Sequence, residues 1–346
     1  MKPEVPGTER GWDAGHRAHR VAVVGATGAV GRELLVLLEE AGHPRGKIAC
    51  FGRAAQSIEI GRGIPFEVLP IERFARADFV FLCTPSEVSR ELAPRLAEQG
   101  ACVIDLSSAF RMDPRIPLVI PEINGALLDR SPRIVANPNC TTAIAALPLA
   151  VLDRAARLEE VIVVSYQAAS GAGRAGLSAL EAETRAAAGQ AAREPREPSP
   201  FPATLALNVI PGVSEPDATG VTGEERKIEG ELRKILDRED LVVESTTARV
   251  PVERCHSVAV HARFARDLDP GAARGLLRTA PGIVLVDDPH GPRPRECASS
   301  DPVHVGRVRA GARGARSLCF FAVGDQLRKG AALNALQIAA RLPARG

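Results

Sequence analysis

Long apolar runs, aromatic residues and a strong net charge are all missing from this sequence of 346 residues. No uninterrupted apolar run approaches the roughly 20 residues of a membrane-spanning helix, so the sequence predicts no membrane partner. The formal net charge is +2, and aromatic residues make up 3% of the chain. Both values argue against a nucleic-acid partner, because such partners favour strong positive charge and stacking aromatic rings.

Cysteine pairs at disulfide or metal-binding spacing are also absent. The seven cysteines are scattered without a CxxC pair, at Cys50, Cys83, Cys102, Cys140, Cys255, Cys297 and Cys319. This spacing predicts neither a disulfide framework nor a bound metal, and the expected location is the reducing cytoplasm. The composition is 45% hydrophobic and 25% charged, which is typical of a globular protein, and the length favours two domains.

The first half of the chain alternates strands with helices. Residues 1–19 combine charge, glycine and proline, and predict a flexible tail. The β-branched run 21–24 then stops at the glycine-rich segment Gly25–Gly31, and a leucine-rich helix is expected over 33–40. A strand, a glycine turn and a helix are the arrangement that presents backbone N–H groups to a pyrophosphate, although the spacing here is GxxGxxG.

Further strands are predicted over 47–51, 77–83 and 102–106, with a helix over 87–99. This alternation predicts a parallel sheet covered on both faces, as in a Rossmann-like α/β domain. The second strand ends at Phe51, and Arg53 follows it without an acidic residue at the strand end. An arginine there favours the 2′-phosphate of NADP, and a solvated surface arginine is the alternative.

The second half has a different pattern. Strands are predicted over 161–166, 242–249, 257–264 and 283–286, and helices over 175–188, 224–236 and 330–341. Together these strands suggest a mostly antiparallel sheet, as expected of a separate α+β substrate and dimerisation domain. The last helix is expected to return and complete the first domain.

Cys140 stands where a loop turns into the apolar run 143–152. A thiol at a helix N-terminus lies at the positive end of the helix dipole, which favours the nucleophilic thiolate. A small buried core residue is the alternative, because most free cysteines are of that kind. Pro148 lies inside this run and predicts a kink in the helix.

Eight segments in order resemble the aspartate-semialdehyde dehydrogenase family, over nearly the whole chain after residue 20. These segments are Gly25–Gly31, Ser107–Asp113, Pro121–Asn124, Asn137–Thr142, Tyr166–Gly173, Glu224–Lys227, Arg249–Ser257 and Leu327–Ala332. The resemblance implies NADP-dependent, reversible reductive dephosphorylation of L-4-aspartyl phosphate to L-aspartate 4-semialdehyde through a cysteine thioester. It also implies a place in the pathway to lysine and diaminopimelate, methionine and threonine, and a homodimer.

The resemblance also implies site residues. The catalytic residues would be the nucleophile Cys140, the acid/base His256 and the orienting Gln167. The substrate would contact Asn139, Gln167, Glu224 and Arg249, with Arg249 gripping its carboxylate and Glu224 its ammonium group. Phosphate would contact Arg111 and Lys227. The implied cofactor-binding residues are Gly25, Thr27, Gly28, Ala29, Val30, Arg53, Ala54, Ser170, Gly171 and Gln326.

The domain boundaries follow from the same segments. We expect an NADP-binding domain over 20–138, completed by a C-terminal segment over 326–346, and a catalytic and dimerisation domain over 139–325. The chain departs from the family at Cys255, where glycine is usual, and at Gln326, where asparagine is usual.

Two alternatives remain open. N-acetyl-γ-glutamyl-phosphate reductase shares the fold and the cysteine chemistry, but its nucleophile segment resembles Pro-Gly-Cys-Tyr-Pro-Thr, unlike Asn139–Thr142 here. A non-catalytic homologue acting as a binding protein would be expected to lose Cys140 or His256, and both are present.

Overall fold

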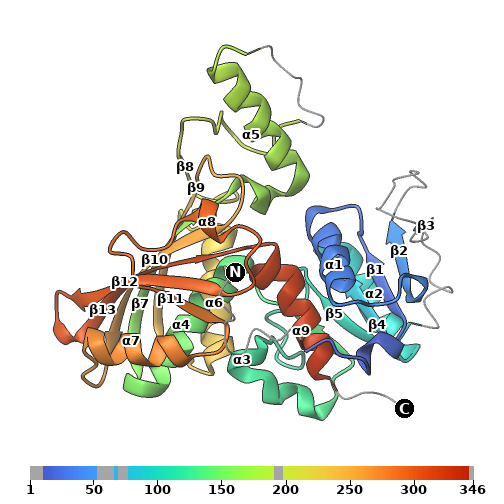
Figure 1. Ribbon diagram of the computed structural model, residues 1–346, viewed down its shortest axis with the longest axis horizontal. Coiled ribbons are helices and arrows are strands. Elements are labelled where there is room, and N and C mark those ends of the chain that lie inside the picture. The colour runs from blue at the N-terminus through green and yellow to red at the C-terminus, as the bar shows by residue number, and fades with distance from the viewer. Residues whose placement is uncertain (1–10, 53–65, 69–76, 191–197, 343–346) are drawn as a thin grey trace. The chain divides into compact units, whose positions relative to one another are not determined.

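The computed structural model describes residues 11–52, 66–68, 77–190 and 198–342 (Figure 1). The chain forms two compact units. One comprises residues 140–330, and the other comprises the described residues before Cys140 together with those after Gly330. Residues 326–330, which we expected in the first domain, therefore belong with the catalytic half.

The first unit contains a six-stranded parallel sheet in the order β3-β2-β1-β4-β5-β6. Its strands are β1 (Val21–Val24), β2 (Ile48–Gly52), β3 (Phe66–Val68), β4 (Phe79–Leu82), β5 (Cys102–Asp105) and β6 (Ile134–Ala136). Its helices are α1 (Ala29–Glu40), α2 (Ser86–Glu98), the short α3 (Pro121–Asn124) and α9 (Leu333–Arg341). The predicted Rossmann-like α/β architecture is confirmed.

Alternate residues of the buried strands point to opposite faces of this sheet. Val21 and Val23 of β1 pack with the leucines of α1 and α9, whereas Ala22 and Val24 pack with α2. A strand with both faces covered must be apolar at every position, which is why β1 is a continuous β-branched run.

The expected flexible tail is wrong for residues 11–19. Trp12 is 5% exposed in the core beside α1, and its ring packs edge-on against Phe79. Its indole N–H donates to Nδ1 of His43 at 3.1 Å. This is the only tryptophan in the sequence, and the large apolar area of one indole ring anchors a segment whose other residues are small or polar.

The second unit contains a seven-stranded mixed sheet in the order β11-β12-β13-β10-β7-β9-β8. Only β7–β9 and β11–β12 pair in parallel, and the other four pairs are antiparallel, so the expected mostly antiparallel sheet is confirmed. The strands are β7 (Leu158–Gln167), β8 (Ile210–Pro211), β9 (Val242–Arg249), β10 (His256–Phe264), β11 (Ile283–Val286), β12 (Val303–Gly311) and β13 (Gly314–Gly324).

The helices of this unit are α4 (Cys140–Ala156), α5 (Gly173–Ala187), α6 (Gly223–Leu236), α7 (Pro270–Thr279) and α8 (Pro294–Cys297). α4 is central, because it packs on α6 and α7 and on strands β7, β10 and β13 (Figure 1). It continues through Pro148 as one helix to Ala156. Twelve of the 17 residues of α4 are buried, including all of 141–150, so tertiary packing outweighs the backbone hydrogen bond that this proline cannot make.

Among the described residues, no helix is both long and apolar enough to cross a membrane. In the same part of the chain, no three His, Cys, Asp or Glu side chains come together as a group that could hold a metal ion.

Candidate active site

Cys140 is the first residue of α4. It is partly exposed, whereas Thr141 and Thr142 behind it are fully buried. Gly330 lies directly against it, since a Cβ built on this glycine would be 2.8 Å from the Cys140 Cβ. Cys140 is therefore partly exposed at the N-terminal end of a long helix, where the positive end of the helix dipole favours negative charge.

Gln167 and Arg249 are the last residues of two parallel neighbours, β7 and β9, and they stand opposite each other in the ladder. Parallel strands end at the same edge of a sheet, which brings a buried amide and a buried guanidinium together. Gln167 is 2% exposed and Arg249 is 7% exposed. Nη1 of Arg249 donates to the carbonyl oxygen of Ala168 at 2.7 Å, which leaves other N–H groups of the fork for a ligand.

Glu224 lies in the first turn of α6 and reaches the same place. Its Oε1 accepts from Nε2 of Gln167 at 3.2 Å, and its Oε2 is 3.4 Å from Nζ of Lys227. Glu224 and Lys227 are three residues apart, so they share one face of the helix as expected. The start of α6 is held by a capping box between Thr222 and Glu225.

His256, the first residue of β10, is fully buried. Its Nδ1 accepts the backbone N–H of Ala168 at 3.0 Å, so the neutral ring has its proton on Nε2. This Nε2 has no hydrogen-bond partner among the described residues. Burial, and secondarily the Arg249 charge, lower the pKa of His256 to about 3, which keeps the ring neutral at pH 7.

Gly171 packs closely against these groups, and there is no room for a side chain at this position. A Cβ built there would lie 2.7 Å from Nη1 of Arg249 and 3.1 Å from Nε2 of His256. Cys140 and Glu224 also interact electrostatically with Arg249. Burial lowers the pKa of Arg249, while the negative charges of a Cys140 thiolate and of Glu224 act in the opposite direction. One region of this unit thus combines a thiol, an imidazole, a guanidinium and a carboxylate.

Ser170 and Gln326, two of the expected cofactor residues, contact each other in this unit. Nε2 of Gln326 donates to Oγ of Ser170, and Oε1 of Gln326 accepts the backbone N–H of Cys255 at 2.8 Å. Both side chains are buried. The protein itself therefore engages both ends of the Gln326 amide.

The other unit contains the expected cofactor-binding residues of the turn between β1 and α1. Gly25 has φ of +79°, and a Cβ there would be 2.2 Å from the carbonyl oxygen of Cys83. Gly28 caps α1 without any side-chain hydrogen bond, followed by Ala29 and Val30 in the first turn. This compact turn, with helix N–H groups that no capping side chain covers, fits the pyrophosphate of a dinucleotide.

Two further expected residues are buried in that unit. Arg111 is 8% exposed, and it donates from Nε to the carbonyl oxygen of Asn137 at 2.9 Å and from Nη2 to that of Leu106 at 3.1 Å. Asn139 is 6% exposed. Arg53 and Ala54, expected beside the cofactor ribose, lie outside the described residues.

Sequence reasoning missed two residues of this region. Ala168 donates the N–H that orients His256, and Gly330 packs directly against Cys140. Ala168 acts through its backbone, so its residue type contains no signal. Asp325 was also missed, although it is fully buried and forms an ion pair with Arg254. Its position directly after an apolar strand could have indicated Asp325 from the sequence.

Comparisons with known proteins agree with this geometry. The chain matches two family models, "Semialdehyde dehydrogenase, NAD binding domain" over residues 20–131 and "Semialdehyde dehydrogenase, dimerisation domain" over residues 149–329. It is 40% identical to the aspartate-semialdehyde dehydrogenase of Streptomyces akiyoshiensis, covering 92% of this chain and 97% of that protein. The corresponding protein of Synechocystis is 37% identical over 94% of this chain and 98% of its own length.

A solved structure is also similar. The crystal structure of aspartate semialdehyde dehydrogenase II from Vibrio cholerae, complexed with ASA, superposes with a TM-score of 0.86 at 33% sequence identity. The match covers 94% of this chain and 98% of that one.

Proposed function

The chain belongs to the aspartate-semialdehyde dehydrogenase family, and from this premise we propose that it interconverts L-4-aspartyl phosphate and L-aspartate 4-semialdehyde with NADP as cofactor. The observation that best supports this proposal is the cluster of Arg249, Gln167 and Glu224 beside His256 and Cys140. An amino acid has a carboxylate and an ammonium group, and the cluster offers a buried guanidinium and a buried carboxylate for them.

The substrate-binding roles follow from charge and geometry. Arg249 would bind the α-carboxylate with the N–H groups that do not contact Ala168, because a guanidinium fork matches a carboxylate. Glu224 would meet the ammonium group, and Gln167 and Asn139 would orient the reacting carbonyl. Arg111 and Lys227 would hold phosphate, as cations on two separate segments.

Cys140 would form the covalent intermediate. Its thiolate attacks the acyl carbon of aspartyl phosphate, the new C–S bond forms, and the C–O bond to phosphate breaks with release of inorganic phosphate. NADPH, when bound, supplies the hydride that reduces the resulting thioester. Collapse of the thiohemiacetal releases the aldehyde and returns the thiolate.

His256 would act through Nε2. Because Nδ1 accepts the Ala168 N–H, the proton on Nε2 is the one available to the oxyanion that forms on the substrate carbonyl. Proton transfer at the same atom completes the acid/base role implied by the resemblance.

The cofactor would bind along the turn formed by Gly25, Thr27, Gly28, Ala29 and Val30, with Arg53 and Ala54 near the ribose and Ser170 and Gly171 near the nicotinamide. We infer NADP rather than NAD because Arg53 replaces the acidic residue that would bind a free ribose 2′-hydroxyl. Repeating the activity assay with NAD in place of NADP tests this inference, and equal kcat/KM for the two cofactors would contradict it.

We also propose a homodimer in a reducing compartment such as the cytoplasm. The sheet face opposite α4 presents half-buried apolar side chains, including Ile162, Val164 and Phe321, around the exposed ring of Tyr166. A second copy would cover this face, in keeping with the name of the matched dimerisation model. All seven cysteines are free thiols in the structure, which suits a reducing compartment.

The decisive experiment measures phosphate-dependent NADPH formation from L-aspartate 4-semialdehyde. We expect turnover by the wild type and a loss of at least about 10³-fold in Cys140→Ser, since a hydroxyl is a far weaker nucleophile than a thiolate. Cys319→Ser is the matched control, because Cys319 is also partly exposed but lies on β13. Turnover only with N-acetylglutamate semialdehyde would favour the reductase alternative, and no turnover of either aldehyde would favour a binding protein.

A further inference from the structure

We propose that Phe201 is a positioning residue for Arg249. Its ring supports the guanidinium in place of an acidic side chain, and so leaves the positive charge of Arg249 for a carboxylate of the substrate. The catalytic consequence rests on the proposed function, in which Arg249 binds the α-carboxylate, but the structural part concerns only residues of one compact unit.

Arg249 is a buried cation without an acidic partner. It is the last residue of β9 and is 7% exposed. Among the described residues it forms no ion pair, and its one hydrogen bond runs from Nη1 to the carbonyl oxygen of Ala168 at 2.7 Å. Burial away from water is costly for a cation unless another group supports the charge. A group other than a carboxylate must therefore support Arg249.

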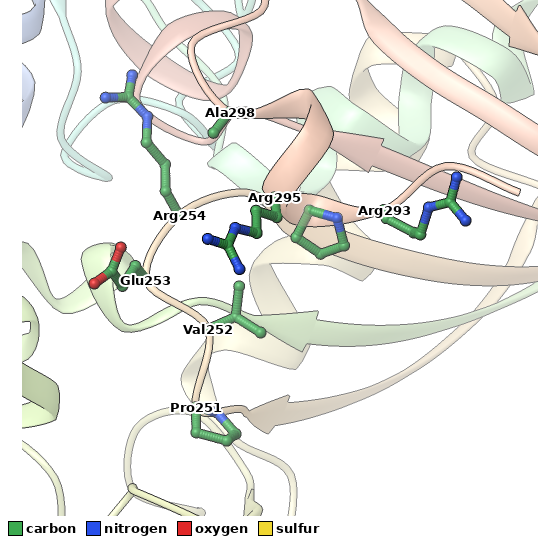
Figure 2. Close-up of a pocket in the computed structure, with 8 residues that line it drawn as sticks. Pro251, Val252, Glu253, Arg254, Arg293, Arg295 and Ala298 are labelled. Atoms are coloured by element: carbon green, nitrogen blue, oxygen red, sulfur yellow. The ribbon is translucent and has the colours of Figure 1, made fainter. Parts of the chain in front are cut away.

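The arginines that follow in the chain are supported in the usual way. Residues 251–254 line a pocket of about 570 Å³, which the chain from Arg293 to Ala298 borders on its other side (Figure 2). Two of its arginines form ion pairs although they are more exposed than Arg249, Arg254 with Asp325 at 2.6 Å and Arg293 with Asp288 at 2.9 Å. Figure 2 shows the guanidinium groups of Arg254, Arg293 and Arg295 pointing in different directions, so they do not form one anion site.

The ring of Phe201 provides the support that a carboxylate provides elsewhere. Cζ of Arg249 lies over this ring, 5.8 Å from its centroid. The face of an aromatic ring attracts a cation, and the attraction is stronger where water is excluded. A carboxylate in the same place would also neutralise the guanidinium and compete with a bound carboxylate for its N–H groups. An aromatic face stabilises the cation and leaves its charge available.

The guanidinium keeps one edge for a ligand. Nη1 is the atom that donates to Ala168, and a Cβ built on Gly171 would lie 2.7 Å from the same atom. Nε and Nη2 of Arg249 make no hydrogen bond within the part of the chain that the structure describes. Two N–H groups on one edge of a guanidinium match the two oxygens of a carboxylate. The contacts with Phe201 and Ala168 thus fix the position of a fork that a substrate carboxylate can occupy.

Helix α5 holds the segment that presents the ring. A Cβ built on Gly176 of this helix would lie 3.1 Å from Cζ of Phe201, so glycine leaves the space that the ring fills. Glu183, also on α5, accepts the N–H groups of Leu205 and Ala206 with Oε2, at 2.7 and 3.0 Å. The ring is therefore anchored on both sides of Phe201, by packing on α5 and by the hydrogen bonds that follow in the chain.

The test compares Phe201→Leu and Phe201→Tyr with the wild type in the phosphate-dependent assay. Leu keeps an apolar side chain and removes the aromatic face. We expect Phe201→Leu to raise KM for L-aspartate 4-semialdehyde about tenfold, with kcat and KM for phosphate changed less than about twofold, because a binding contact is lost. Phe201→Tyr keeps the face and should keep KM within about twofold of the wild type. A KM that is equal in Phe201→Leu and the wild type would overturn the proposal.

Two further variants separate charge from packing. Phe201→Glu should raise KM more than Phe201→Leu does, because its carboxylate would pair with Arg249 and exclude the substrate. Phe264→Leu removes a fully buried ring of β10 in the same unit, and should lower stability but leave KM unchanged. If Phe201→Leu does not fold, pentafluorophenylalanine at position 201 keeps the shape of the ring and removes the negative charge of its face. An unchanged KM in that variant would then overturn the proposal.

A readout without turnover distinguishes this proposal from the proposed function. ¹H–¹⁵N NMR of the Arg249 Nε–H, assigned with Arg249→Lys, should show an upfield proton shift from the ring current in the wild type. The shift should be lost in Phe201→Leu and kept in Phe201→Tyr. Absence of turnover by the wild type would contradict the proposed function alone, and the NMR comparison would still decide the role of Phe201. An Arg249 signal that is the same in Phe201→Leu and the wild type would overturn that role.

Discussion

Two buried histidines show how single residues of this chain depend on where the backbone takes them. Nδ1 accepts an N–H in both, from the backbone of Ala168 at His256 and from the Trp12 indole at His43. Burial lowers the pKa of both rings, to about 3 for His256 and about 4 for His43. Each ring is therefore neutral at pH 7. In the unfolded chain a histidine takes up a proton below a pKa near 6.5, whereas in the folded chain these two rings stay neutral until the pH is much lower.

His43 gives a pH prediction that is independent of activity. Between pH 6.5 and about 4 the unfolded chain takes up a proton at this residue and the folded chain does not, so stability falls as pH falls through this window. The slope from this group is at most about 1.4 kcal/mol per pH unit. We expect His43→Gln, which keeps an acceptor for Trp12, to flatten the decline in the free energy of unfolding measured by urea titration.

The control for this experiment is His290→Gln, because His290 is exposed. A decline with pH that is equally steep in His43→Gln and in the wild type would contradict the prediction.

At the scale of elements, the starts of α1 and α6 each carry residues that we propose to bind a ligand. α1 begins directly after the glycine turn, four residues earlier than the expected start at 33. The difference arises because Gly31 lies inside the first turn, where a Cβ would be 2.5 Å from the carbonyl oxygen of Gly25. A glycine inside a helix argues against a helix on propensity alone, and here close packing on the turn requires it.

Gly25→Ala tests the turn between β1 and α1. The added Cβ would collide with the Cys83 carbonyl at a positive φ, so we expect a loss of about 2 kcal/mol or more in the free energy of unfolding and weaker NADPH binding. Gly46→Ala is the matched control, because a Cβ at Gly46 would have nothing within 4 Å among the described residues. Urea unfolding and NADPH titration of both variants give the comparison, and equal values for the two would contradict the prediction.

The capping box at the start of α6 is the basis of the second prediction at this scale. Glu225 accepts the N–H of Thr222 with Oε2 and the N–H of Thr247 with Oε1, which joins the helix cap to β9. Burial tends to raise the pKa of Glu225, but these hydrogen bonds outweigh it and lower the pKa. We expect Glu225→Gln to lower the free energy of unfolding by about 1–2 kcal/mol and to raise KM for the aldehyde, since Glu224 is the preceding residue.

The exposed Glu244→Gln on β9 serves as its control. A change in stability without any change in KM would show that the cap does not position Glu224.

At the scale of the whole molecule, the chain crosses from one compact unit to the other at Asn139/Cys140 and returns after Gly330. Cys140, the proposed nucleophile, is therefore the first described residue of its unit, and Gly330, which packs on it, is the last. Both crossing points lie at the proposed reaction centre, so the chain connections themselves place the thiol there.

The half-buried apolar face around Tyr166 on the seven-stranded sheet predicts the oligomeric state. Tyr166→Glu places a charge among the half-buried apolar residues of that face, and we expect it to convert a dimer into monomers at micromolar concentration, as measured by analytical ultracentrifugation. Leu276→Glu on α7 is the control, because Leu276 and Tyr166 are each 38% exposed. A Tyr166→Glu variant that sediments as the wild type does would place the interface elsewhere.

Sequence patterns predicted the longer apolar strands and most of the long helices, but they missed the amphipathic α7 and the short apolar β6. They missed β12 and β13, where arginines and glycines interrupt the apolar positions, for example Arg307, Arg309 and Gly311. They also missed that the segment around Trp12 is anchored in the core. In each case contacts distant in sequence supply the stabilisation, and local patterns do not record them.

The sequence by itself determined the family, the two-part architecture and the identity of the chemical groups, because ordered motifs specify residue types in series. Only the tertiary structure decided that Gln167 and Arg249 end side by side, that Nδ1 of His256 is occupied by a backbone N–H, and that Arg249 lies over the Phe201 ring. These are distances between segments far apart in the chain, and Ala168 and His256, for example, are 88 residues apart. Packing of the folded chain sets such distances, and a linear order of residues does not contain them.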